Sequence, residues 1–126
     1  MFISDLSVLI QKIEDRGAKP LLVTHAVQSN SIPTSEDLVA LQASLLHTPR
    51  ATPQLVLDFE AAIREEILAF AESGKLTVVD LARALNGRHE AFGDLVHFTD
   101  AGAAAAAQLI AEIIVSLPSS TRTPRN

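Results

Sequence analysis

Two short apolar stretches decide the fold class of this chain: "LLVT" at Leu21–Thr24 and "KLTVVD" at Lys75–Asp80. The first is a short continuous apolar run rich in β-forming residues, which predicts a strand buried on both faces, and the second predicts another buried strand. A long helical pattern separates the two strands, so a parallel pairing is favoured. The sequence therefore predicts an α/β fold, although two parallel strands do not make a stable sheet by themselves.

Helical periodicity predicts two amphipathic helices, one before the first strand and one between the strands. Over residues 4–16 apolar positions recur at helical spacing, with Ser4 as the expected N-cap and Gly17 as the left-handed residue after the helix. Residues 53–73 form a second, longer series that Gly74 is expected to terminate. Its expected apolar face consists of Val56, Phe59, Ile63, Ile67 and Phe70, and its expected outer face of Glu60, Arg64 and Glu65.

Three shorter helices complete the prediction. Thr34 or Ser35 can cap a helix over residues 38–45, because both hydroxyls precede an acidic first turn. The stretch "LARALNG" predicts a short helix or turn that ends near Gly87. Thr99 can cap the alanine-rich last helix. The elements thus alternate between helix and strand, as in an α/β domain.

Length and composition limit the classes of function. A chain of 126 residues fits one domain, and its net charge of -5 without a basic cluster argues against a nucleic-acid partner. The absence of cysteine excludes disulfides and thiolate metal sites. No apolar stretch has the length of a membrane span or of a signal-peptide core, so a cytoplasmic location is expected for the chain as written. Residues 118–126, "PSSTRTPRN", are expected to be a disordered tail.

The stretch "FGDLVHFTDAG" places Asp94 three residues before His97. In serine hydrolases an imidazole removes the proton of the hydroxyl, while a carboxylate orients that imidazole and stabilises its charged form. An aspartate three residues before a histidine can do this from one loop, and this loop is expected near the carboxyl ends of the strands, where α/β folds bind ligands. Alternatively the spacing arises by chance, and Asp94 only caps a turn.

The other histidines give weaker indications. His25 directly follows the first strand and either belongs to a site or binds a backbone carbonyl as an ordinary loop residue. Asp80 ends the second strand and is expected to cap the next helix. His47 and His89 have no evident partner and are expected to be exposed to solvent. No pair of histidines has a recognised ligand spacing, so no metal site and no cofactor are expected.

The block "DLVHFTDAG" resembles the last block of the SGNH, or GDSL, hydrolases, whose DxxH motif supplies the catalytic acid and base. The segments "GAKPLLVTHAV" and "FEAAIREEILAFAESGKLTVVDLARAL" are similar, in order and spacing, to the C-terminal half of such domains. The resemblance implies a three-layer α/β/α, flavodoxin-like sandwich, of which residues 1–117 would be a part. It also implies cofactor-free hydrolysis of esters or acetylated small molecules, with Asp94 as the orienting acid and His97 as the general base.

The chain departs from that family at the nucleophile. Neither the GDS motif nor the GxND motif of the oxyanion hole occurs, and neither Ser4 in "SDLS" nor Asn30 has the required neighbours. The resemblance thus implies a missing N-terminal half, which could have carried an export signal, and an exposed sheet edge that could bind a protein partner. A non-catalytic interaction domain and a truncated remnant without activity are the alternatives.

Overall fold

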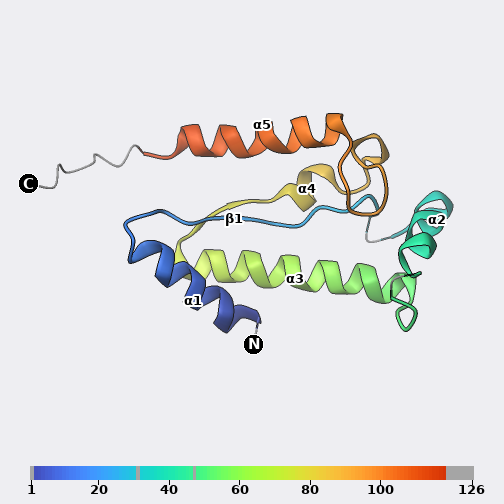
Figure 1. The fold of residues 1–126 in the computed structure, drawn as a ribbon, viewed down its shortest axis with the longest axis horizontal. Coiled ribbons are helices and arrows are strands. Elements are labelled where there is room, and N and C mark those ends of the chain that lie inside the picture. Colours follow the sequence, from blue (N-terminus) through green and yellow to red (C-terminus); the bar gives the residue numbers. More distant parts are fainter. Residues whose placement is uncertain (1, 31, 47, 119–126) are drawn as a thin grey trace, which may run out of the picture.

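The structure is a computed structural model that describes residues 2–30, 32–46 and 48–118 and has a mixed α/β fold, mostly helical (Figure 1). The elements in chain order are α1 (Phe2–Glu14), β1 (Leu21–Val23), α2 (Ser35–Ser44), α3 (Pro53–Gly74), β2 (Thr77–Val79), α4 (Leu81–Leu85), the 3₁₀ turn η1 (His89–Ala91) and α5 (Asp100–Ser116). β1 and β2 pair in parallel, with Leu21 opposite Thr77 and Val23 opposite Val79. The predicted α/β class and the parallel pairing are confirmed.

The helices are arranged around the two strands. In Figure 1 the strand pair runs between α3 and α5, and β2 contacts both of these helices. α1 and α2 contact opposite ends of α3. The segments that follow β1 and β2 emerge at one end of the molecule, together with the connection from η1 to α5. This end carries the polar residues considered below.

Two buried clusters form the core. The first joins the strand pair to α4, η1 and α5, and its buried members are Ala26, Val79, Leu81, Leu85, Ala91, Phe92 and Ala106. The second lies where the segment after β1 meets α2 and α3, and its members are Val27, Leu41, Leu57 and Leu95. Because the second cluster includes a residue from the segment between η1 and α5, hydrophobic packing fixes that segment to the rest of the chain.

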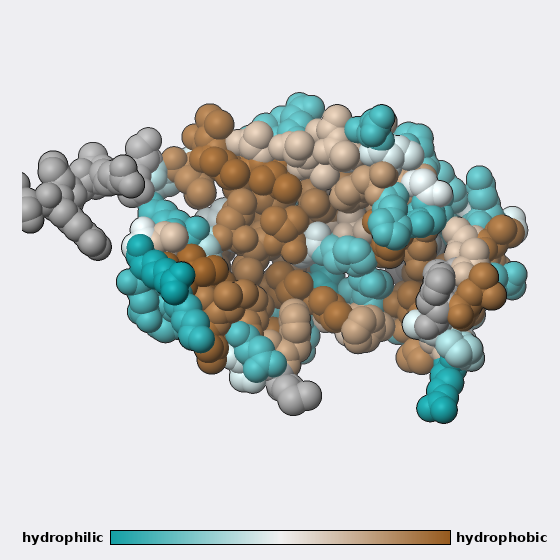
Figure 2. Space-filling view, viewed as in Figure 1, coloured by the Kyte–Doolittle hydropathy of each residue, from teal (hydrophilic) through white to brown (hydrophobic). Residues whose placement is uncertain are grey.

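One face of the molecule leaves apolar side chains in solvent. Figure 2 shows that apolar side chains gather between α5 and α1, over β1. Val23 is 38% exposed, so the prediction that this strand is buried on both faces is wrong at its last residue. Large apolar side chains that are more than half exposed on α1 and α5 are Phe2, Val8, Leu9, Ile114 and Val115. We call this region, between α5 and α1 and over β1, the uncovered face.

The ends of α1 differ in part from the prediction. The helix begins at Phe2, so Ser4 lies inside its first turn and is not the N-cap. Its other end is confirmed: Gly17 has a φ of 75°, a left-handed conformation that glycine adopts without steric cost.

The predicted end of α3 is also displaced. The helix includes Gly74, and Lys75 takes the left-handed conformation with a φ of 52°. The backbone N–H of Leu76 donates to the carbonyl of Ala71 at 2.8 Å, which closes the helix end. A Cβ on Gly74 would approach Cγ of Leu76 to 3.3 Å, so the small residue allows Leu76 to fold back over the last turn.

The predicted helix caps are largely confirmed. Thr34 caps α2 and forms a reciprocal capping box with Asp37. Thr99 caps α5, and Asp80 caps α4. Gly87 has a φ of 77° and ends the turn after α4. Local side-chain chemistry therefore sets most helix boundaries in this chain.

Some predictions concern parts of the chain that the structure does not describe. His47 and residues 119–126 of the expected tail lie outside the described residues. Within the described ranges, no helix combines the length and the apolar character that crossing a bilayer requires.

Candidate active site at the carboxyl ends of the strands

The segment over residues 92–98 is a closed loop. Phe92 and Phe98 form an antiparallel bridge, and their rings lie 5.0 Å apart. The backbone N–H of Gly93 donates to the carbonyl of His97 at 2.8 Å, inside this bridge. The backbone and the ring contact thus hold the two ends of the loop together before α5 begins.

Contacts to the segment after β1 place this loop at the carboxyl end of the strands. The N–H of Gln28 donates to the carbonyl of Leu95 at 2.8 Å. The side chain of Leu95 is 6% exposed and belongs to the core cluster with Val27, Leu41 and Leu57. The position expected from the sequence is confirmed, although the side chains at residues 94, 96 and 97 remain exposed.

Asp94 and His97 contact each other within the loop. Nδ1 of His97 lies 2.8 Å from Oδ2 and 3.0 Å from Oδ1 of Asp94. Oδ1 also accepts the backbone N–H groups of His97 at 2.8 Å and of Val96 at 3.0 Å. Asp94 therefore caps a turn and also contacts the imidazole. The backbone N–H of His97, its ring and the N–H of Val96 lower the pKa of Asp94 to about 2.

This geometry favours one state of the imidazole. Because a carboxylate holds Nδ1, the neutral ring carries its proton on Nδ1 and leaves Nε2 as a free acceptor. The side chains are 80% exposed for His97 and 58% exposed for Asp94, so Nε2 is accessible to a reacting hydroxyl. Among the described residues, no serine hydroxyl is hydrogen-bonded to His97. The pair can thus orient a base but does not contain its nucleophile.

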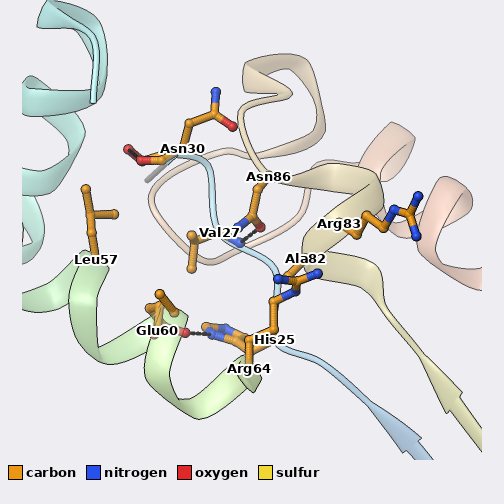
Figure 3. Close-up of a pocket in the computed structure, with 11 residues that line it drawn as sticks. His25, Val27, Asn30, Leu57, Glu60, Arg64, Ala82, Arg83 and Asn86 are labelled. Carbon is orange, nitrogen blue, oxygen red and sulfur yellow. Dashed lines mark hydrogen bonds and ion pairs between the residues drawn. The ribbon is translucent and has the colours of Figure 1, made fainter. Parts of the chain in front are cut away.

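A second carboxylate–imidazole pair is formed by Glu60 and His25 (Figure 3). Nδ1 of His25 is 2.9 Å from Oε2 of Glu60 on α3. His25 therefore binds a carboxylate and not a backbone carbonyl, which was one of the two alternatives predicted for it. This hydrogen bond raises the pKa of His25, against an opposing effect of desolvation. The pair borders a cavity of about 200 Å³ whose other lining residues are Val27, Ser29, Asn30, Leu57, Ala61, Arg64, Ala82, Arg83 and Asn86.

Arg64 reaches the end of β2. Its Nε and Nη2 donate to the two carboxylate oxygens of Asp80 at 2.9 and 2.5 Å, and Thr24 donates to Oδ1 at 2.9 Å. The Arg64 hydrogen bonds are the main reason that the pKa of Asp80 is lowered. Glu60 and Arg64 were predicted to lie away from the face of this helix that packs on the strands, and for these two residues the prediction is wrong. Glu60 binds His25, two residues after β1, and Arg64 binds the carboxylate of Asp80, which directly follows β2.

His89 also has a partner that its sequence neighbours did not indicate. Its Nε2 lies 3.0 Å from Oδ1 of Asp37, whose side chain has no exposed surface. Nδ1 lies 3.7 Å from Oε1 of Glu36. The prediction of an exposed, unpartnered histidine is wrong: η1 carries this ring to the first turn of α2.

The described residues contain no group of three or more histidine, aspartate or glutamate side chains placed to hold a metal ion. The acidic and imidazole groups occur instead as small local contacts, Asp94 with His97, Glu60 with His25, and Asp37 and Glu36 with His89. The polar end of the molecule therefore consists of acid–histidine and acid–arginine pairs.

Comparisons with known proteins return no match. No protein-family model fits the chain, and neither a search of curated proteins nor a search of solved structures finds a similar one. The function must therefore be inferred from the residues and their geometry.

Proposed function

We propose that this chain supplies the acid and the general base of an SGNH-type serine hydrolase, in which Asp94 orients His97. The observation that carries the proposal is the contact between the Asp94 carboxylate and Nδ1 of His97, which leaves Nε2 exposed. The proposed substrates are esters or acetylated small molecules. We also propose that the strand pair belongs to a larger three-layer sandwich, for which the positions of α3 and α5 around the strands give support.

In the proposed reaction Nε2 of His97 removes the proton of a serine hydroxyl while the serine oxygen attacks the ester carbonyl. The imidazolium that forms is stabilised by Asp94, which stays ionised because its pKa is about 2. His97 then returns the proton to the departing alcohol, and the same residue activates water to release the acid from the acyl-enzyme. His97 thus acts as base and acid in turn, while Asp94 stays ionised throughout.

The serine and the oxyanion donors of this proposal come from a further polypeptide segment. The sequence of the chain contains neither a GDS nor a GxND motif. The uncovered face between α5 and α1 supports the docking of such a segment, because a two-stranded sheet with exposed apolar side chains gains stability when further strands cover it. A segment that pairs with β1 would approach the carboxyl end at which His97 lies.

The experiment is hydrolysis of p-nitrophenyl acetate by the chain, first alone and then with an added serine-bearing N-terminal half of an SGNH hydrolase. We expect the mixture to be faster than either component, and we expect His97→Ala to remove the gain. Asp94→Asn keeps one side-chain oxygen for the backbone N–H groups but removes the charge, and it should lower the rate of the mixture by about 10²- to 10⁴-fold.

His25→Ala is the matched control, because His25 is the other exposed histidine whose Nδ1 is bound to a carboxylate. This variant should leave the gain intact. A complex that forms without any His97-dependent hydrolysis, or a gain that falls equally in the His25 and His97 variants, would refute the proposal.

A second candidate function is a non-catalytic interaction domain, and the uncovered face is the observation that favours it. If that face binds a protein and the Asp94 turn is only structural, Ile114→Glu should abolish association measured by sedimentation velocity, while Asp94→Asn should leave association unchanged. The hydrolysis assay separates the two candidates, since only the first one predicts a rate that depends on His97.

A further inference from the structure

A groove of about 460 Å³ lies between the N-terminal part of α3 and the loop that carries Asp94 and His97. α3 contributes Leu55, Val56 and Phe59, and the loop contributes Leu95 and Val96. The remaining lining residues are Thr48, Ala51 and Glu60. The groove is thus almost entirely apolar, and its volume is within the usual range of small-molecule sites, about 300–1,000 Å³.

One wall of the groove is formed by the loop that carries the acid–histidine pair. Leu95 and Val96 are the two residues between Asp94 and His97, and the N–H of Val96 donates to Oδ1 of Asp94 at 3.0 Å. Consecutive Cα atoms are about 3.8 Å apart, so the wall that Val96 forms begins one residue from the proposed base. His97 thus directly follows a residue of the groove wall.

Several apolar side chains of the groove are exposed to water, and a bound ligand would cover them. Phe59 is 60% exposed and Leu55 is 56% exposed, and the two lie one turn apart on the same face of α3. Val96 is 37% exposed on the opposite wall. An apolar ligand that contacts both walls would remove this surface from water, which is the main source of affinity in such sites.

The charges around the groove favour a neutral ligand. Glu60 is the only charged lining residue, and it also accepts a hydrogen bond from His25 at the border of the neighbouring polar cavity. No lysine or arginine lines the groove, and the chain has a net charge of -5. A free carboxylate or phosphate would thus be repelled, whereas a hydrocarbon chain would not.

We propose that this groove binds the hydrocarbon chain of the acyl group of an ester, with the carbonyl directed to His97; the assignment rests on the hydrolase function proposed above. A methylene group has about the volume of a water molecule, roughly 30 Å³, so the groove of about 460 Å³ has room for a straight chain of at most about fifteen carbons. Phe59 is the main contact and a residue that sets the preferred chain length.

The experiment measures binding of butan-1-ol, hexan-1-ol and octan-1-ol to the full chain by ¹H–¹⁵N NMR. These neutral probes need no nucleophile. We expect shifts at Leu55, Phe59, Leu95 and Val96 and an affinity that rises about two- to fourfold for each added methylene. Phe59→Ala should weaken the binding of octan-1-ol about tenfold.

Phe2→Ala is the matched control, because Phe2 is 51% exposed on α1 and does not line the groove. It should bind octan-1-ol as the wild type does. Equal affinities of the Phe59 and Phe2 variants, the absence of a trend with chain length, or shifts that cluster on the uncovered face would overturn the proposal.

The results of the binding and hydrolysis experiments show which of the two proposals has failed. If hydrolysis of the completed site depends on His97 but octan-1-ol does not bind in the groove, the acyl-chain assignment is wrong and the hydrolase proposal stands. If octan-1-ol binds as expected but no His97-dependent hydrolysis occurs, the hydrolase proposal is wrong, and the assignment of an ester to the groove is overturned with it.

Discussion

Adding a single methyl group at Gly102 should destabilise the fold. It is buried in the first turn of α5, where a Cβ would lie 1.9 Å from the carbonyl oxygen and 2.8 Å from the carbonyl carbon of Ala91. Ordinary contact begins near 3.4 Å, so α5 and η1 would have to separate by about 1.5 Å. The atoms in the way are backbone, so no side-chain rotation can relieve the contact.

We expect Gly102→Ala to lower the free energy of unfolding by about 2 kcal/mol. Overpacking costs about 1–3 kcal/mol, and the upper end applies because the atoms in the way are backbone; subtracting the gain of about 1 kcal/mol that alanine brings to a helix leaves about 2 kcal/mol. Urea unfolding followed by far-ultraviolet circular dichroism is the assay, because the chain has neither Trp nor Tyr. The midpoint should fall by about 1 M.

The control for this prediction is Ala104→Gly, two residues further along α5 at an exposed position. It should cost about 1 kcal/mol from helix propensity alone and leave the NMR shifts of Val96 and His97 unchanged. Gly102→Ala should move both shifts, because η1 leads directly into their loop. A Gly102→Ala chain that is as stable as the wild type would refute the steric argument.

The remaining predictions concern the polar pairs. Arg64→Met should destabilise the fold by about 2 kcal/mol, and a double-mutant cycle with Asp80→Asn should give a coupling of about 1.5 kcal/mol; additive effects would contradict a direct interaction. Because the pKa of Asp80 lies below its ordinary value of 3.8, its stabilisation is present above that value and is lost as the pH falls through the lower folded value, so the stability difference between wild type and Asp80→Asn should shrink in strong acid. The pKa of His25 is raised above 6.5, so the His25–Glu60 pair should stabilise fully below that value and lose its effect as the pH rises through the higher folded value. The difference in urea midpoint between wild type and His25→Asn should therefore shrink as the pH rises through that folded value, and a difference that is the same at every pH would exclude this ion pair.

Features that depend on neighbours in the sequence were predictable. Thr34 and Thr99 cap helices because a hydroxyl there can accept a free N–H of the first turn, and Gly17 is left-handed because glycine has no Cβ. The strands could be identified because a short, continuous apolar run has few other uses in a domain of this size. The contact between Asp94 and His97 also joins residues of one turn, so its spacing alone was sufficient.

Pairs between distant segments were not predictable in the same way. Glu60 and Arg64 were assigned to the outer face of α3 because periodicity sorts residues by hydropathy and not by charge. In the structure the polar ends of the strands attract this helix face. The only signal was that Glu60 and Arg64 are four residues apart and opposite in charge to His25 and Asp80.

The two acid–histidine pairs differ in what holds the acid, and this difference favours His97 as the base. Oδ1 of Asp94 accepts two backbone N–H groups, so the carboxylate keeps its place and its charge when the imidazole changes state. Glu60 instead lies on a helix and reaches Nδ1 of His25 through Oε2. Removal of the His97 ring should therefore leave the Asp94 turn intact, so that a loss of hydrolysis in His97→Ala reports the missing base and not a collapsed loop. Unchanged amide shifts of Val96 in that variant would establish this, and a displaced Val96 would show that the imidazole holds the turn.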